Sequence, residues 1–395
     1  MTEKWSANNY HELNDIALEY GERTWVRDVE GTWYLDCLAG YSANNFGHRN
    51  PALVEAAKNQ LNKLTLTARA YKQDQLEPFC RELGELTSKE AVLPMNTGAE
   101  AVETAIKLSR KWGYEVKGIP KNKANIIVMH DNFHGRTTSI VGFSDDNSAR
   151  GGFGPFAPGF RRVAYGDSRA IENAIDENTA AILFEPIQGE AGVIIPPNGY
   201  LREIRDICNR ENVLMMADEI QSGFGRTGED FVCEHEGVEP DVYILGKALG
   251  GGIVPVSAVC ANRDIMDVIK AGEHGSTFGG NPLACAVGRA AIGLLNTGRY
   301  QKNARDRGRE MQAGLEELIG HGVTEVRSRG LWFGVDIDPA LMTGRRACER
   351  LLQRNVLAKD THGSTIRFSP PLNIFPEEVD FAVRQLRDTL YAARR

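Results

Sequence analysis

The sequence lacks an apolar run long enough to cross a membrane, and it lacks an excess of basic residues. Its 395 residues include 46 Lys and Arg against 53 Asp and Glu, a formal net charge of -7. A membrane-spanning helix needs about 20 apolar residues in a row, and a protein that binds nucleic acid is expected to carry a basic face. Both kinds of partner are therefore disfavoured. Residues 1–5 also lack the apolar core of a signal peptide, so we expect a cytoplasmic protein.

Cysteine is scarce and never occurs as Cys-x-x-Cys. The seven cysteines are scattered between Cys37 and Cys348, which predicts reduced, mostly buried thiols and no disulfide framework. Two pairs of metal-binding residue types do occur, His130 with His134 and Cys233 with His235. Neither pair has the remaining ligands at a typical spacing, so we expect no metal site.

A convincing dinucleotide fingerprint is also missing. The segment Gly223-Phe-Gly-Arg-Thr-Gly228 fits G-x-G-x-x-G, but one match is a weak signal. No acidic residue at the expected distance completes a βαβ unit. We therefore do not expect a dinucleotide site.

Strands and helices alternate through the middle of the chain, which predicts an α/β fold with a mostly parallel sheet and helices on both faces. Near the C-terminus they are segregated, which predicts a small α+β domain. We expect an N-terminal segment at 1–47, a large domain at 48–290 and a C-terminal small domain at 291–395. The expected strands are at 24–37 (a hairpin), 92–95, 124–130, 161–165, 179–184, 213–217, 244–245, 254–260, 323–327, 331–337 and 365–368. The expected helices are at 51–61, 73–86, 99–112, 168–177, 199–212, 263–270, 282–295, 300–319, 345–354 and from 376 onward.

Two residues at strand ends organise the expected site. Asp218 ends the apolar run Val213-Leu-Met-Met-Ala217, and Lys247 follows Ile244-Leu-Gly246 before three glycines. Parallel sheets present reactive groups at their carboxyl edge. A lysine can form an imine with pyridoxal phosphate, and a carboxylate keeps the pyridine nitrogen protonated. The alternative is that Asp218 is only a loop or cap residue and Lys247 a solvated charge.

The segment Val92-Leu-Pro-Met-Asn-Thr-Gly98 leads from a short strand into a helix that begins near Ala99. The first-turn amides and the dipole of a helix attract anions. An ordinary strand-to-helix connection is the alternative, but beside a cofactor lysine this turn is suited to a phosphate.

These motifs resemble one known family. Ala217-Asp-Glu-Ile-Gln-Ser-Gly-Phe-Gly-Arg-Thr-Gly228 and Gly246-Lys-Ala-Leu-Gly-Gly-Gly252 are similar to the signature of the class III, or ω-amino acid, aminotransferases, and the resemblance covers nearly the whole chain. It implies fold type I of the pyridoxal phosphate enzymes, with a small domain built from both chain ends. It also implies that Lys247 and Asp218 are catalytic and that Gln221 contacts the phenolic oxygen of the cofactor.

The resemblance implies further cofactor contacts. The phosphate would bind at Gly98 and Ala99, and Phe133 would lie against the face of the ring. Thr277 in Gly275-Ser-Thr277 would reach the cofactor of a neighbouring subunit, which implies a homodimer with composite sites.

Four residues match the substrate site of family members that act on ornithine: Tyr41, Arg136, Glu190 and Arg367. The resemblance implies transfer of the δ-amino group of L-ornithine to 2-oxoglutarate, giving glutamate 5-semialdehyde and L-glutamate, in arginine and proline metabolism. One departure is Lys72, at or beside a position where the family carries an aromatic or histidine side chain near the substrate.

Other functions remain open from the sequence. Family members that act on N-acetylornithine generally lack the tyrosine found here at Tyr41. Aminomutases and 4-aminobutyrate aminotransferases share the same fold. A non-catalytic interaction protein would be expected to lose Lys247 or Asp218, and both are present. Glu190 is expected to pair with Arg367 and to mask its guanidinium while ornithine binds. A plain structural ion pair between these two residues is the alternative.

Overall fold

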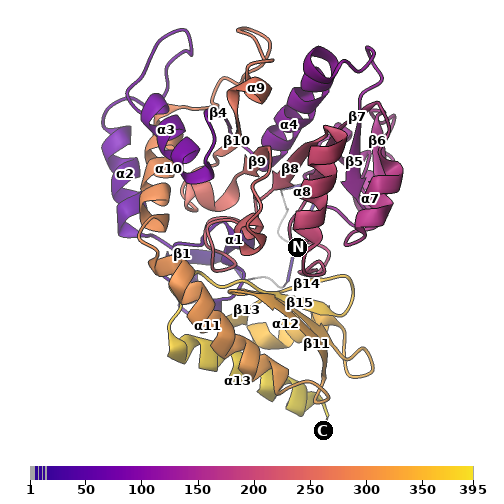
Figure 1. The fold of residues 1–395 in the computed structure, drawn as a ribbon. Helices are drawn as coiled ribbons and strands as arrows, with labels where there is room; N and C mark the ends of the chain where they lie inside the picture. The colour runs from indigo at the N-terminus through magenta and orange to yellow at the C-terminus, as the bar shows by residue number, and fades with distance from the viewer. Residues whose placement is uncertain (1–4, 8, 11, 14–15, 395) are drawn as a thin grey trace.

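The computed structural model describes residues 5–7, 9–10, 12–13 and 16–394. Residues 1–4, on which most of the signal-peptide prediction depends, lie outside this set. The chain forms a large body around a seven-stranded sheet and a smaller body that carries the C-terminal helices (Figure 1). Among the described residues, no helix is both long and apolar enough to cross a membrane.

The large sheet has the order β4-β10-β9-β8-β7-β5-β6. Its five neighbouring strands from β9 to β6 run parallel, while β10 is antiparallel to both β4 and β9. The expectation of a mostly parallel sheet is therefore confirmed. The strands are β4 (Ala91–Met95), β5 (Asn125–Met129), β6 (Phe160–Val163), β7 (Thr179–Phe184), β8 (Leu214–Asp218), β9 (Val242–Leu245) and β10 (Ser257–Ala261).

Helices cover both faces of this sheet because successive side chains of each strand point to opposite sides. Ile126 and Val128 of β5 pack with α4, whereas Ile127 and Met129 pack with α7 and α8. All four side chains are fully buried. The covering helices are α4 (Gly98–Trp112), α7 (Ser168–Ala174) and α8 (Tyr200–Glu211).

A second group of helices packs beside β9, β10 and the small body. The first of them, α2, begins at Pro51 because Asn50 accepts a hydrogen bond from the amide of Ala52 and proline needs no partner for its nitrogen. Asn281 and Pro282 begin α10 in the same way. The group consists of α2 (Pro51–Leu61), α3 (Leu76–Thr87) and α10 (Pro282–Leu295), and the shorter helices are α1 (Ala39–Ser42), α5 (Thr138–Val141), α6 (Asn147–Arg150) and α9 (Arg263–Met266).

Both chain ends build the smaller body, as expected. One sheet has the order β1-β2-β3-β13, so a C-terminal strand completes an N-terminal sheet, and the other has the order β11-β12-β15-β14. The strands are β1 (Leu18–Glu22), β2 (Trp25–Asp28), β3 (Trp33–Asp36), β11 (Val323–Arg329), β12 (Trp332–Ile337), β13 (Val356–Leu357), β14 (Lys359–Thr361) and β15 (Thr365–Phe368). The helices are α11 (Arg299–Glu316), α12 (Gly344–Leu352) and α13 (Pro376–Ala393).

Several boundaries differ from the sequence expectation. The strand expected from residue 254 begins only at Ser257, after Pro255, whose nitrogen cannot donate to a sheet. The helix expected at 263–270 ends at Met266, and β1, β13 and β14 were not predicted. The division at 47/48 and 290/291 stays a prediction, and α10 runs without a break across the second of these positions.

Candidate active site

Lys247 and Asp218 follow neighbouring strands and reach the same edge of the sheet. Asp218 is the last residue of β8, and Lys247 begins a short 3-10 helix, Lys247–Gly250, two residues after β9 ends. Lys247 has a positive φ of 44°, a backbone conformation that is uncommon outside glycine and concentrates at functional sites. The sheet therefore delivers an amine and a carboxylate to one place.

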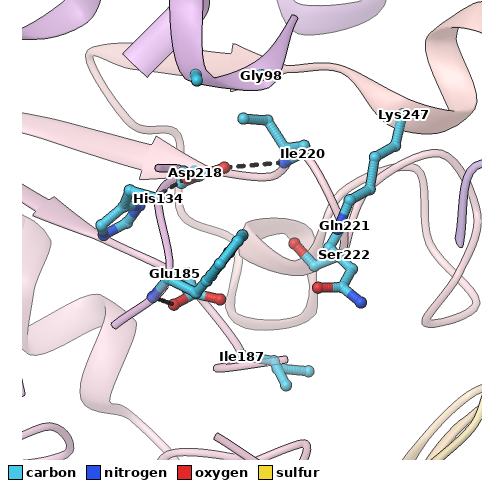
Figure 2. A pocket seen from close by; sticks show the side chains of 12 residues that line it. Gly98, His134, Glu185, Ile187, Asp218, Ile220, Gln221, Ser222 and Lys247 are labelled. Carbon is cyan, nitrogen blue, oxygen red and sulfur yellow. Dashed lines mark hydrogen bonds and ion pairs between the residues drawn. The ribbon is translucent and has the colours of Figure 1, made fainter. Parts of the chain in front are cut away.

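These two residues line a cavity of about 200 Å³ at the carboxyl edge of the sheet. In Figure 2, Lys247 and Gln221 lie on one side of this cavity, and Asp218 and His134 lie on the other. The lining includes every residue that was predicted to hold the cofactor within one subunit. The complete lining is Gly98, Ala99, Phe133, His134, Gly135, Glu185, Ile187, Asp218, Ile220, Gln221, Ser222 and Lys247.

The first turn of α4 offers free donors to this cavity. Thr97 and Glu100 form a capping box, which uses the amides of Asn96, Thr97 and Glu100. The amides of Gly98 and Ala99 have no hydrogen-bond partner within the described part of the chain. Unpaired first-turn amides and the helix dipole fit a bound phosphate.

His134 was not predicted at the site, and it is bound directly to Asp218. Its Nδ1 lies 2.6 Å from Oδ2 of Asp218, and both side chains are buried. Burial opposes a charge on the imidazole, but the hydrogen bond and the negative charge of Asp218 raise the pKa of His134 overall. A protonated His134 would donate a charge-assisted hydrogen bond to the Asp218 carboxylate.

Glu185 is a second residue that the sequence reasoning missed. It lies in the lining of the cavity and accepts hydrogen bonds from the amides of Phe133, at 2.9 Å, and Gly189, at 3.2 Å. Burial raises the pKa of Glu185 to about 7, and the charge of Asp218 adds to this rise. Glu185 thus fixes the backbone of Phe133, whose ring lines the cavity.

The electrostatic surroundings of Lys247 favour a reactive amine. Burial lowers its pKa, while the negative charges of Glu190 and Asp218 oppose that fall. A lysine with a lowered pKa is neutral more often, and the neutral amine is the nucleophile and the base. Together with the free amides, Lys247 and Asp218 form a donor set that fits pyridoxal phosphate.

Glu190, Arg367 and Tyr41 come together from three different parts of the chain. Nη1 of Arg367 lies 2.6 Å from Oε1 of Glu190, and the guanidinium lies over the Tyr41 ring at 5.6 Å from its centroid. Burial raises the pKa of Glu190, but the charge of Arg367 and its hydrogen bond bring that pKa below its ordinary value. Burial raises the pKa of Tyr41, so its hydroxyl stays protonated at neutral pH.

Tyr41, Glu190 and Arg367 are not among the residues that line the cavity, and the same holds for three further residues singled out in the sequence, Arg136, Thr277 and Lys72. Arg136 is exposed and stands 5.8 Å from the centroid of the Phe133 ring. Thr277 and Lys72 are exposed, and neither lines the cavity within this chain. Arg136 therefore borders the site, whereas the predicted role of Thr277 needs a second subunit.

The two residue pairs considered for metal binding have other partners. His134 binds Asp218, and His130 binds Asp145 at 2.9 Å. His235 binds the Thr227 hydroxyl at 3.1 Å. Among residues 5–7, 9–10, 12–13 and 16–394, no group of three or more His, Cys, Asp or Glu side chains is arranged to hold a metal ion.

Comparison with known proteins places these observations in a family. The model of the class-III aminotransferases matches residues 5–390. The ornithine aminotransferase of Oceanobacillus iheyensis is 50% identical over 389 residues, which cover 98% of this chain and 97% of that protein.

Two solved structures are similar over almost the whole chain. The ornithine aminotransferase of Toxoplasma gondii, described with partial occupancy of pyridoxal phosphate at its active site, is 41% identical with a TM-score of 0.96 and covers 99% of this chain and 93% of its own. The acetylornithine aminotransferase of Elizabethkingia anophelis is 43% identical with a TM-score of 0.88 and covers 98% and 96%. The expectation of fold type I is confirmed. The chain belongs to the class-III aminotransferases, enzymes whose cofactor is pyridoxal phosphate.

Proposed function

We propose that this enzyme transfers the δ-amino group of L-ornithine to 2-oxoglutarate, giving glutamate 5-semialdehyde and L-glutamate. The observation that carries the proposal is the ion pair between Arg367 and Glu190, 2.6 Å apart, in electrostatic contact with Lys247. The curated relatives at about 50% identity named ornithine aminotransferase support the same substrate.

The ion pair addresses a problem of regiochemistry. Ornithine has two amines, and an unpaired Arg367 would bind the α-carboxylate and bring the α-amine to Lys247. A carboxylate paired with Arg367 masks the guanidinium fork. The α-carboxylate would then bind Arg136 at the border of the site, with the α-amine near Tyr41, so the δ-amine reaches Lys247.

In the second half-reaction the pair would open. The α-carboxylate of 2-oxoglutarate would bind Arg367 through two parallel hydrogen bonds, and its distal carboxylate would bind Arg136. Two substrates of different charge can then share one site, because Glu190 pairs with Arg367 for the first substrate and releases it for the second.

The remaining residues of the cavity support the proton transfers. When bound, pyridoxal phosphate supplies an electron sink that makes the carbon bearing the transferred amine acidic. Lys247 would accept that proton as general base and would then donate it, as general acid, to a carbon of the cofactor. The pair of Asp218 and His134 would hold a proton at the ring nitrogen. Gln221 would orient the ring from the side opposite Asp218.

We also propose that the enzyme works in the cytoplasm as a homodimer. The loop with Thr277 also carries Phe278, which is 55% exposed, and Tyr71 on a neighbouring loop is 72% exposed. Arg69 and Gln73 donate hydrogen bonds to the carbonyl oxygens of Gly279 and Gly280, at 3.0 Å each, and so join the two loops. Apolar side chains exposed on joined loops suit a subunit interface.

Transfer from N-acetylornithine is the second candidate, since a solved acetylornithine aminotransferase is 43% identical. Acetylation removes the charge of the α-amine, so that substrate would not need a polar partner such as Tyr41. A plain structural role for the Glu190 and Arg367 pair would leave the choice of amine to other residues. 4-Aminobutyrate has no α-carboxylate, so a donor of this kind would not require Glu190 to mask Arg367.

The test compares donors in single-turnover reactions of the holoenzyme, with the visible absorbance of the bound cofactor as the readout. Ornithine should react faster than N-acetylornithine and 4-aminobutyrate. In Glu190→Ala, α-transamination of glutamate should accelerate relative to the δ-reaction of ornithine by about tenfold or more, because removing one charged hydrogen bond is worth roughly 1.5–3 kcal/mol. Glu317→Ala, which breaks a surface pair with Arg387, is the matched control. An unchanged ratio in Glu190→Ala, or a preference of the wild type for N-acetylornithine, would contradict the proposal.

A further inference from the structure

We infer that Thr361 and Arg327 are positioning residues that fix the backbone around Glu190 to the sheet that carries Arg367. The loop concerned is residues 185–194, between β7 and α8, which we call the Glu190 loop. The inference rests on the proposed function, since it explains how Glu190 is presented to Arg367. Its consequence is that the ion pair opens by rotation of the Glu190 side chain and not by movement of the loop.

Two side chains of the small sheet bind carbonyl oxygens at the tip of this loop. The Thr361 hydroxyl donates to the carbonyl oxygen of Glu190 itself, at 2.6 Å. Arg327 donates through Nε and Nη2 to the carbonyl oxygen of Gly192, at 3.2 and 3.1 Å. Asp336 holds the guanidinium of Arg327 at 2.7 and 2.8 Å. The carbonyl oxygens on both sides of the tip are therefore held from one sheet.

The same sheet carries Arg367. In the β-ladder, Arg367 of β15 lies opposite Gly334 of β12 and Lys359 of β14, and Thr361 follows Lys359 by two residues. Arg367 and the anchor for Glu190 thus sit on adjacent strands of one hydrogen-bonded unit. Both partners of the ion pair share the same rigid support.

The backbone of the loop lies directly against β12. A Cβ atom placed on Gly334 would approach the carbonyl oxygen of Gly192 to 2.1 Å, which no real side chain tolerates. Gly192 has a φ of 112° and Val193 a φ of 57°. A bend of this kind is costly for valine and persists only where surrounding contacts enforce it.

The base of the loop is bound to the large body. The Gln188 side chain donates to the carbonyl oxygen of His130 at 2.7 Å, and within the loop the amide of Gly189 donates to the Glu185 carboxylate at 3.2 Å. Gln188 and Ile194 also pair through both backbone groups. The loop is thereby closed at its base and held at its tip, which leaves the Glu190 side chain as the part free to turn.

The experiment substitutes Thr361 and follows two readouts in the holoenzyme. Thr361→Val keeps the shape of the side chain and removes the hydroxyl, while Thr361→Ser keeps the hydroxyl. Thr324→Val is the matched control, since Thr324 binds the carbonyl oxygen of Asp336 at 3.2 Å on the same sheet but is exposed and does not contact the Glu190 loop. Arg327→Lys tests the second anchor. The readouts are the ratio of the glutamate α-reaction to the ornithine δ-reaction, and hydrogen exchange of the amides at 192–194.

In Thr361→Val we expect the ratio to rise about fivefold, the equivalent of one ordinary hydrogen bond, and the exchange at 192–194 to accelerate. Arg327→Lys should change both in the same direction. Thr361→Ser and Thr324→Val should match the wild type. Unchanged ratio and exchange in Thr361→Val, with a changed ratio in Glu190→Ala, would overturn the anchor and leave the proposed function standing. If Glu190→Ala itself leaves the ratio unchanged, the masking of Arg367 in the proposed function is wrong. Hydrogen exchange at 192–194 then tests the positioning role of Thr361 by itself. Faster exchange in Thr361→Val supports that role, and unchanged exchange overturns it.

Discussion

Nδ1 of His134 lies 2.6 Å from one carboxylate oxygen of Asp218, and the other oxygen accepts a hydrogen bond from the amide of Ile220 at 3.1 Å. Residues of the protein alone therefore orient both oxygens of the Asp218 carboxylate. The same residue lines the cavity. This arrangement makes His134 a positioning residue for the carboxylate in the proposed mechanism.

His134→Phe should lower the rate of the first half-reaction about tenfold to a hundredfold, since a charge-assisted hydrogen bond is worth roughly 1.5–3 kcal/mol. His134→Asn can place an amide donor where Nδ1 stands and should recover part of this loss. The measurement is stopped-flow absorbance together with the dissociation constant of the cofactor. Equal rates in His134→Phe and the wild type would remove His134 from the mechanism.

Borohydride reduction of the purified holoenzyme should convert the imine between Lys247 and the cofactor into a stable secondary amine, which makes the attachment irreversible and abolishes the visible absorbance. Lys247→Ala should show no such attachment and should lose at least about a hundredfold in turnover, because general acid and base catalysis contributes that much or more. Peptide mass spectrometry identifies the labelled residue. Lys72→Ala, at an exposed lysine outside the cavity lining, is the control and should be labelled at Lys247 as in the wild type. A label on another lysine would contradict the assignment.

The buried Glu185 should make the cofactor-free protein less stable as the pH rises. Burial raises its pKa from 4.5 to about 7 in the folded state, so between these values the folded chain binds more protons than the unfolded chain. Stability then falls with increasing pH across this window and levels off above it.

Glu185→Gln removes this contribution, which is at most about 3 kcal/mol for a shift of this size. The difference in the free energy of unfolding between pH 4.5 and pH 7.5, measured in urea, should therefore be smaller in Glu185→Gln than in the wild type. Glu55→Gln, at an exposed position on α2, should leave the difference unchanged. An equal pH dependence in Glu185→Gln would show that folding does not raise the pKa of Glu185.

Thr277 can be tested by mixing two inactive variants. If Thr277 serves the partner's site, a heterodimer of Lys247→Ala and Thr277→Ala has one site with both defects and one with neither. Random exchange of subunits should then restore about a quarter of the wild-type activity, since half of the dimers are mixed and each has one intact site. Sedimentation checks that dimers form. No recovery after verified exchange would assign Thr277 to its own subunit.

Gly334→Ala should destabilise the protein because the new methyl group meets the carbonyl oxygen of Gly192. We expect a loss of about 1–3 kcal/mol, the usual effect of overpacking a tight site, together with faster hydrogen exchange in the Glu190 loop. Gly293→Ala is the matched control, since nothing lies within 4 Å of a Cβ placed there. That helical position should gain up to about 1 kcal/mol. Thermal unfolding of both variants gives the comparison.

The sequence predicted the parts of the site that are marked by short stretches of neighbouring residues. Apolar runs marked the strands, so the residues that follow them, Asp218 and Lys247, could be assigned to one edge of the sheet. The family motifs added Gln221, Phe133 and the first turn of α4, and all of these line the cavity. The ion pair between Glu190 and Arg367 was anticipated from the same resemblance.

The parts that were missed depend on contacts across large distances in the chain. His134 and Asp218 are 84 positions apart, and nothing local connects them. A signal did exist, since His134 and Glu185 both follow buried strands that neighbour β8 or lie one strand beyond it. The unpredicted strands have another cause: β13 has two residues, and β14, Lys-Asp-Thr, is polar. Such strands exist only because neighbouring strands pair with them.

The parallel pairing of β13 with β3 has a consequence for how the chain folds during synthesis. Val356 lies opposite Leu35 and Leu357 opposite Asp36, so the first sheet stays incomplete until residues 356–357 have left the ribosome. Contacts between such distant residues form slowly because a long loop must close first. Until then the open edge of β3 is available to other strands, and Tyr41, which follows β3 closely, lacks Arg367 beside it. Folding of the substrate site therefore depends on the arrival of β13 and β15, whereas the large sheet can assemble earlier.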